Sequence, residues 1–106
     1  MKLFLYETSG GKNLIIEYIK NLEKSERSGL YDIIRRLKLE GMSFLKKQDT
    51  RQLKGKLWEI KYKQNRMMYV LIEGDKIYVV HICKKQKQKA EKFEIELALR
   101  RLKEII

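Results

Sequence analysis

The chain has 106 residues, of which 43% are hydrophobic and 37% are charged, and it carries a formal net charge of +11 at pH 7. This length suffices for one hydrophobic core but not for two, and the composition is that of a folded domain rather than a disordered chain. The chain has no apolar run near the roughly 20 residues of a membrane span, and the apolar run near its N-terminus is too short for a signal peptide. Its single cysteine excludes an internal disulfide. We therefore expect one cytoplasmic domain over residues 1–106, with no membrane anchor.

The first half of the chain predicts one strand followed by two helices. Residues 2–7 are apolar and aromatic, as in a short strand, and a glycine pair follows them. From Leu14 to Leu22 apolar residues recur at helical spacing, and a second run with the same period ends at Gly41. Residues 25–29 interrupt the period, so we expect two helices joined as a hairpin.

The second half predicts three strands and a final helix. Residues 42–56 have mixed polarity, typical of a loop with one helical turn. Strands follow over residues 57–62, 66–72 and 76–83, and residues 90–106 form a helix. The helix residues expected to face the core are Phe93, Leu97, Ala98, Leu102, Ile105 and Ile106. The order β-α-α-β-β-β-α predicts an α+β fold, with an antiparallel sheet, an N-terminal helical hairpin and a C-terminal helix.

The positive charge is concentrated on the segment that is predicted to form strands. Residues 41–92 hold 14 of the 25 Lys and Arg residues against five acidic residues, a net charge of +9. Residues 1–40 carry a net charge of +2, and the acidic and basic residues of 93–106 balance. A sheet with this much positive charge is expected to bind a polyanion, of which nucleic acid is the commonest.

Three stretches of this basic segment together resemble the RelE/ParE superfamily of toxins from toxin–antitoxin systems, and most closely its phage-derived, HigB-like branch. Residues 53–61 read LKGKLWEIK, Arg66 and Tyr69 follow on the next strand, and residues 81–85 read HICKK. Ala98 in the last helix also fits the family pattern. The resemblance implies a RelE-like fold over the whole chain.

Three residues depart from the family pattern. Lys61 stands where arginine is usual, which keeps the charge but loses the bidentate fork. Cys83 stands where phenylalanine is favoured, and Asn65 where glycine is common. None of these departures removes a positive charge, but they leave the subfamily and its target open.

The resemblance implies that the protein cleaves mRNA on the ribosome without a metal ion or other cofactor. It also implies a small cognate antitoxin with a helix-turn-helix domain, which neutralises the toxin in a hetero-oligomer. In such a cleavage the ribose 2′-OH attacks the adjacent phosphorus and the 5′-oxygen leaves. Cations are therefore needed around the phosphate, and groups that accept and supply protons are needed beside it.

Four basic residues are the catalytic candidates. Arg66 is the first candidate for holding the scissile phosphate, with a solvated residue at the start of a strand as the alternative. Lys84 and Lys85 leave a strand together, so only one of them can point into a cleft. Lys61 alternates away from the aromatic residues of its strand and is expected on the RNA-binding face. Glu59, among these cations, is expected to form an ion pair rather than to act as a base.

His81 is the only histidine and a fifth catalytic candidate, because its side chain titrates near neutral pH. The alternative is a hydrogen-bonded core residue, since strand alternation places it on one face with Ile77, Val79 and Cys83. His81 and Cys83 are also a pair of metal-ligand type, but no second pair accompanies them in the sequence. We therefore predict no metal site.

The remaining candidates are expected to bind RNA rather than to catalyse its cleavage. Lys54 and Lys56 flank Gly55, where the backbone can approach a ligand closely. Tyr69 is a candidate for stacking on a base, with a core position as its alternative. Lys87, on the segment after the last strand, adds attraction for the RNA.

Two other functions fit the same composition: a ParE-like poison of DNA gyrase and a basic nucleic-acid-binding module without catalytic activity. The convergence of Lys61, Arg66 and the Lys84/Lys85 pair in one concave site would favour the nuclease over both.

Overall fold

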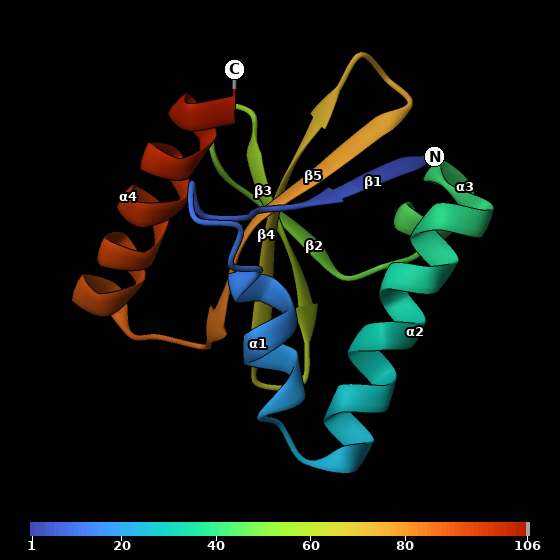
Figure 1. Cartoon of the computed structure of the whole chain (residues 1–106), viewed down its shortest axis with the longest axis horizontal. Helices are drawn as coiled ribbons and strands as arrows, with labels where there is room; N and C mark the ends of the chain where they lie inside the picture. Colours follow the sequence, from blue (N-terminus) through green and yellow to red (C-terminus); the bar gives the residue numbers. More distant parts are fainter. Residues whose placement is uncertain (106) are drawn as a thin grey trace.

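Four helices and five strands make up residues 1–105, the part of the chain that the computed structural model describes (Figure 1). In chain order they are β1 (Lys2–Leu5), α1 (Leu14–Lys20), α2 (Lys24–Glu40), α3 (Met42–Leu45), β2 (Thr50–Lys54), β3 (Leu57–Tyr62), β4 (Asn65–Ile72), β5 (Lys76–Lys84) and α4 (Gln88–Ile105). The strands form one sheet in the order β1-β5-β4-β3-β2. None of the helices in this part of the chain is long and apolar enough to span a bilayer. The predicted α+β class is confirmed.

The sheet is mixed rather than wholly antiparallel. Strands β2 to β5 form an antiparallel meander, but β1 lies parallel to β5, with Leu3 opposite Ile77. The helices between β1 and β2 carry the chain to the far edge of the sheet, and the meander returns to place β5 beside β1 (Figure 1).

The segment 42–56, expected to be a loop with one helical turn, contains the helical turn α3 and also the edge strand β2. The strand escapes prediction because its sequence, TRQLK, has no apolar alternation and most of its side chains are exposed. Its conformation comes from pairing with β3, where Arg51 lies opposite Glu59.

The helical hairpin is confirmed, but its break lies earlier than expected. Helix α1 begins after Asn13, whose Oδ1 accepts a hydrogen bond from the Ile16 amide at 3.0 Å. Helix α2 then starts at Lys24, so residues 25–29 are helical, and it ends at Gly41, whose φ of 62° favours glycine. The glycine within α2, Gly29, lies against the ring of Tyr62 on β3.

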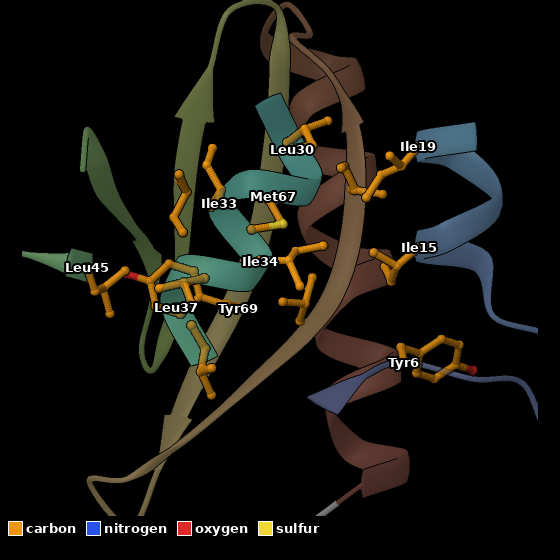
Figure 2. Packing of buried hydrophobic residues seen from close by; sticks show 14 of the residues in the cluster. Tyr6, Ile15, Ile19, Leu30, Ile33, Ile34, Leu37, Leu45, Met67 and Tyr69 are labelled. Atoms are coloured by element: carbon orange, nitrogen blue, oxygen red, sulfur yellow. The ribbon is translucent and has the colours of Figure 1, made fainter. Parts of the chain in front are cut away.

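The larger part of the core lies between the sheet and helices α1, α2 and α3. Figure 2 shows side chains of α1 and α2 pointing at the strands. The buried members of this cluster are Tyr6, Ile15, Ile19, Leu30, Ile33, Ile34, Leu37, Phe44, Leu45, Ile60, Met67, Tyr69, Ile77, Val79 and Ile82. Burial of this apolar surface is the main stabilising term of the fold.

A smaller core lies on the opposite face of the sheet, under α4. Its buried members are Leu57, Met68, Val70, Val80, Cys83 and Ala98. The stripe of α4 that packs there consists of Ile95, Ala98, Leu99, Leu102 and Ile105. Phe93, which we expected in the stripe, is 57% exposed, because it projects from the outer side of the helix. Ile106 lies outside the described residues.

A β-bulge in β5 changes which face its last residues occupy. Met68 on β4 pairs with His81, whereas the next residue, Tyr69, pairs with Val79, so Val80 is an extra residue in β5. The expectation that His81 shares a face with Val79 is therefore wrong: Val79 belongs to the core under α1 and α2, while His81 contacts α4. One extra residue reverses strand alternation beyond the bulge.

We expect Gly29→Ala to lower the free energy of unfolding by about 1–3 kcal/mol, as overpacking does. The added Cβ would lie 1.8 Å from the Tyr62 hydroxyl oxygen, so the ring must move. In a Tyr62→Ala background the same substitution should raise the free energy of unfolding by about 0.5–1 kcal/mol, because alanine is the better helix former. Urea unfolding of the four proteins measures both effects. An effect of the same sign in both backgrounds would contradict this account.

Candidate functional site

Two rows of paired side chains cross the α4 face of the sheet at one end of its central strands. In the first row Arg51, Glu59 and Met68 are neighbours across β2, β3 and β4. In the second row Lys61 on β3 pairs with Arg66 on β4, and Arg66 pairs with Cys83 on β5. Directly opposed residues of neighbouring strands project from the same face, so the register gathers these groups.

The two rows form one wall of a pocket of about 170 Å³, and the N-terminal end of α4 forms another. The charged residues that line it are Arg51, Lys61, Arg66, Lys84 and Lys85, together with Glu59, Glu91 and Glu94. The Lys84 ammonium points away to Glu26, which leaves four basic side chains against three acidic ones, so the pocket favours an anion. Three of these four basic residues were candidates from the sequence for acting on a phosphate, namely Lys61, Arg66 and Lys85.

Arg51 forms ion pairs with two carboxylates and was not among the candidates from the sequence. Its Nε donates to Glu59 Oε2 at 3.1 Å, and its Nη2 donates to Glu91 Oε1 on α4. Glu59 is 1% exposed and lies 3.9 Å from the Arg66 Nε as well. A buried carboxylate needs such partners, and the expectation that Glu59 forms an ion pair agrees with this geometry.

Arg66 is held in place by the hairpin that precedes it. Its Nη1 donates to the carbonyl oxygens of Lys63 and Asn65, both at 2.9 Å. Its Nη2 makes no hydrogen bond within residues 1–105 and remains available to a ligand. Lys61 and Lys85 form no ion pair in the same part of the chain, so both ammonium groups are free to bind an anion.

Lys84 and Lys85 separate at the end of β5, as alternation predicts for two adjacent residues. The Lys84 ammonium lies 3.2 Å from Glu26 Oε2 on α2, on the face opposite α4. The same carboxylate accepts a hydrogen bond from Asn65, and the contacts with Asn65 and Lys84 lower the pKa of Glu26. Lys85 is therefore the member of the pair whose ammonium is left for the pocket.

Asn65 is a buried residue of β4, which begins one residue earlier than the predicted start at residue 66. Its side chain accepts a hydrogen bond from the Tyr18 hydroxyl at 2.7 Å and donates to Glu26 and to the Tyr62 carbonyl. The left-handed backbone of the turn falls instead on Lys63, with φ of 53°. Asn65 thus ties α1 and α2 to the hairpin that presents Arg66.

His81 is buried beneath the pocket and forms a hydrogen bond to Glu94, which lines the pocket. Arg101 Nη1 lies 2.9 Å from His81 Nδ1, and because arginine only donates, Nδ1 is the acceptor. The proton of the neutral ring is therefore on Nε2, which donates to Glu94 Oε2 at 2.8 Å. Burial lowers the pKa of His81, although Glu94 opposes the shift, so the ring stays neutral at pH 7. This geometry agrees with the alternative interpretation, in which His81 is a hydrogen-bonded core residue.

His81, Cys83 and Glu94 bring three atoms of metal-ligand type within 4.8 Å of one another. The sequence showed only the first two, because Glu94 comes from α4. Two features oppose a metal ion here. The Arg101 hydrogen bond to His81 Nδ1 leaves the ring proton on Nε2, the nitrogen that faces Glu94. Burial together with Glu94 raises the pKa of the Cys83 thiol to about 12. The absence of a metal site stays a prediction.

The structure separates the four residues that were expected to bind RNA. Lys54 lies in a groove between β2 and α4, next to the pocket, and Lys87 lies beside the pocket on the segment before α4. Lys56 is at the opposite end of β3, in a groove with Leu102. Tyr69 is 3% exposed in the core under α2, so no face of its ring is open to a base, which corrects that expectation.

Arg51, Glu91, Glu94 and Arg101 belong to the site but were not expected there. Arg51 lies on the strand that had no periodic signal, and the other three lie on the face of α4 that turns to the sheet. Helical spacing places residues 91, 94, 98 and 101 along one side of α4. That spacing is the one sequence signal that could have joined these residues to the site.

The comparisons with known proteins agree with this architecture. The family described as Phage derived protein Gp49-like (DUF891) matches residues 17–103, which include every strand except β1 and most of α4. The chain therefore belongs to the Gp49-like family. This is a toxin-type family related to RelE- and HigB-like toxins. No curated protein matches the sequence.

We expect the stability of the protein to depend on pH through His81. Its pKa is 6.5 in an ordinary environment and lower in the folded protein, so the unfolded chain binds the proton more readily. This contribution to stability is complete above about pH 6.5 and is lost as the pH falls towards the folded-state pKa. Urea unfolding between about pH 7 and about pH 5 should show a slope of up to about 1.4 kcal/mol per pH unit, reduced in His81→Gln. Equal slopes in the two proteins would contradict the assignment.

Proposed function

We propose that this protein is the toxin of a type II toxin–antitoxin system and that it cleaves mRNA on the ribosome without a metal ion. The observation that carries the proposal is the pocket in which Lys61, Arg66 and Lys85 meet. Membership of a toxin-type family supports the biological class, and the pocket supports the chemistry.

The pocket suits a phosphodiester in its size and in the kind of its charges. The free Nη2 of Arg66 and the two unpaired ammonium groups can surround the non-bridging oxygens of one phosphate. Attack by the neighbouring 2′-OH concentrates negative charge on these oxygens, and fixed cations in a partly enclosed site stabilise that charge. The same reaction is impossible on DNA, which lacks the 2′-OH.

The partner expected from the family is a small antitoxin that neutralises the protein in a hetero-oligomer, with a helix-turn-helix domain of its own. A toxin that acts on translating ribosomes works in the cytoplasm, which is the compartment expected from the sequence. The concentration of charge in residues 41–92 would steer both the mRNA and the ribosomal RNA around it to the pocket.

The test is a translation reaction with a defined mRNA, followed by mapping of the RNA ends. Wild-type protein should produce fragments, and Arg66→Ala and Lys85→Ala should each lower the cleavage rate about 100-fold or more, as loss of a transition-state donor does. Lys84→Ala should lower it less than about tenfold, because Glu26 already holds that ammonium on the other face. Lys20→Ala, an exposed lysine at the end of α1, is the matched control and should cleave like wild type.

Intact mRNA with wild-type protein would reject the nuclease. Gyrase-dependent DNA breaks in the same cells would then assign the protein to the gyrase poisons. RNA binding that weakens steeply with salt, without any cleavage, would identify a binding module.

A further inference from the structure

Three carboxylates line the pocket, and they differ in what holds them. Glu59 is almost completely buried and is shared by Arg51 and Arg66. Glu91 is bound to Arg51. Glu94 forms no ion pair with a lysine or arginine within residues 1–105, and its partner is the neutral ring of His81. Among the three, Glu94 is therefore the carboxylate that no lysine or arginine of residues 1–105 neutralises by a direct ion pair.

Glu94 is also held by a hydrogen bond while it remains accessible from the pocket. Its side chain is 16% exposed and lines the pocket, while Oε2 is fixed by the hydrogen bond from His81 Nε2. Behind His81, Arg101 donates to Nδ1 and also to the carbonyl oxygen of Val80 at 3.1 Å. This series of hydrogen bonds therefore ends at Val80 in the bulge of β5. It fixes the orientation of the His81 ring and the direction of its Nε2–H.

We propose that Glu94 is the general base of the cleavage reaction, with His81 and Arg101 as its positioning residues. This inference rests on the proposed function. Glu94 takes the proton from the 2′-OH while the 2′-oxygen forms a bond to phosphorus. The bond from phosphorus to the 5′-oxygen breaks, and the 5′-oxygen takes a proton from the Lys85 ammonium. The products are a 2′,3′-cyclic phosphate and a 5′-OH, with Glu94 protonated and Lys85 neutral until both exchange protons with water.

In the proposed reaction, the two sides of the pocket have different roles. The sheet supplies cations that bind the phosphate, and α4 supplies the base. Groups of both signs face Glu94: His81, Cys83 and Lys85 from β5 and the segment after it, Arg66 from β4, and Glu91 and Arg101 from α4. Because the base and the phosphate-binding cations lie on separate elements, no lysine or arginine of residues 1–105 forms an ion pair with the Glu94 carboxylate.

The principal experiment compares Glu94→Gln with wild type in the mapped translation reaction. Loss of a general base should lower the cleavage rate about 10²- to 10⁴-fold. Affinity for an mRNA with a 2′-deoxy residue at the cleavage point should stay within about threefold, since the phosphate-binding cations remain. Glu96→Gln, the same change on an exposed face of α4, is the matched control and should leave the rate unchanged.

Two further measurements distinguish a base from a merely structural residue. Glu94→Ala should regain part of its rate when formate is added, because a free carboxylate can occupy the vacated position. The cleavage rate of wild type is expected to fall at acid pH, and this fall should be absent in Glu94→Gln. For the positioning residue, His81→Gln retains a side-chain N–H and should lose less activity than His81→Leu.

The outcomes separate this inference from the proposed function. If wild-type protein cleaves mRNA and Glu94→Gln, with a wild-type thermal unfolding midpoint, cleaves within threefold of it, Glu94 is not the base. If Glu94→Gln fails to fold, the formate measurement on Glu94→Ala and the comparison of the two His81 variants take its place. Equal loss of activity in both His81 variants, together with no rescue by formate, overturns the inference. Intact mRNA with wild-type protein overturns the proposed function itself.

Discussion

The extra residue in β5 is the feature on which the geometry of the site depends. A bulge places successive side chains on the same face, and here Val80 enters the core under α4 while His81 meets Glu94 of the same helix. Within the bulge, the Val80 carbonyl oxygen accepts a hydrogen bond from Arg101 Nη1 at 3.1 Å. Without the extra residue, His81 would point into the opposite core, and Glu94 would lose its partner.

The charges of the pocket are balanced by contacts between elements rather than by solvent. Glu59 from β3 holds Arg51 and Arg66, and Glu91 from α4 holds Arg51 as well. Removing one member would leave a buried or half-buried charge without compensation, which is costly. The site is therefore a network in which a few cations are fixed by carboxylates so that others, Lys61 and Lys85, remain free to bind an anion.

The sequence predicted the elements with strong periodicity and the residues whose position follows from simple alternation. Lys61 lies on the face opposite the aromatic residues of its strand, as alternation predicts, because β3 is regular where it pairs with β4. His81 was misplaced because a bulge has no periodic signal of its own. The edge strand containing Arg51 was missed because its side chains are mostly exposed, and only its pairing with β3 defines it.

The contribution of α4 was the hardest to foresee, because it depends on how the helix is docked. Its apolar stripe fixes the distance from the sheet, but its C-terminal end is held by the residue after β1. The Tyr6 hydroxyl donates to Glu104 at 2.6 Å, and the Arg101 guanidinium lies 4.8 Å from the centre of the Tyr6 ring. Arg101 therefore contacts the segment that follows β1, the bulge of β5 and His81 at once. Because Glu94 lies two turns before Arg101 on the same helix, the parallel strand β1 is coupled to the pocket through α4. The motifs within residues 53–85 contain Lys61, Arg66 and Lys85, but they contain neither Arg51 nor this connection.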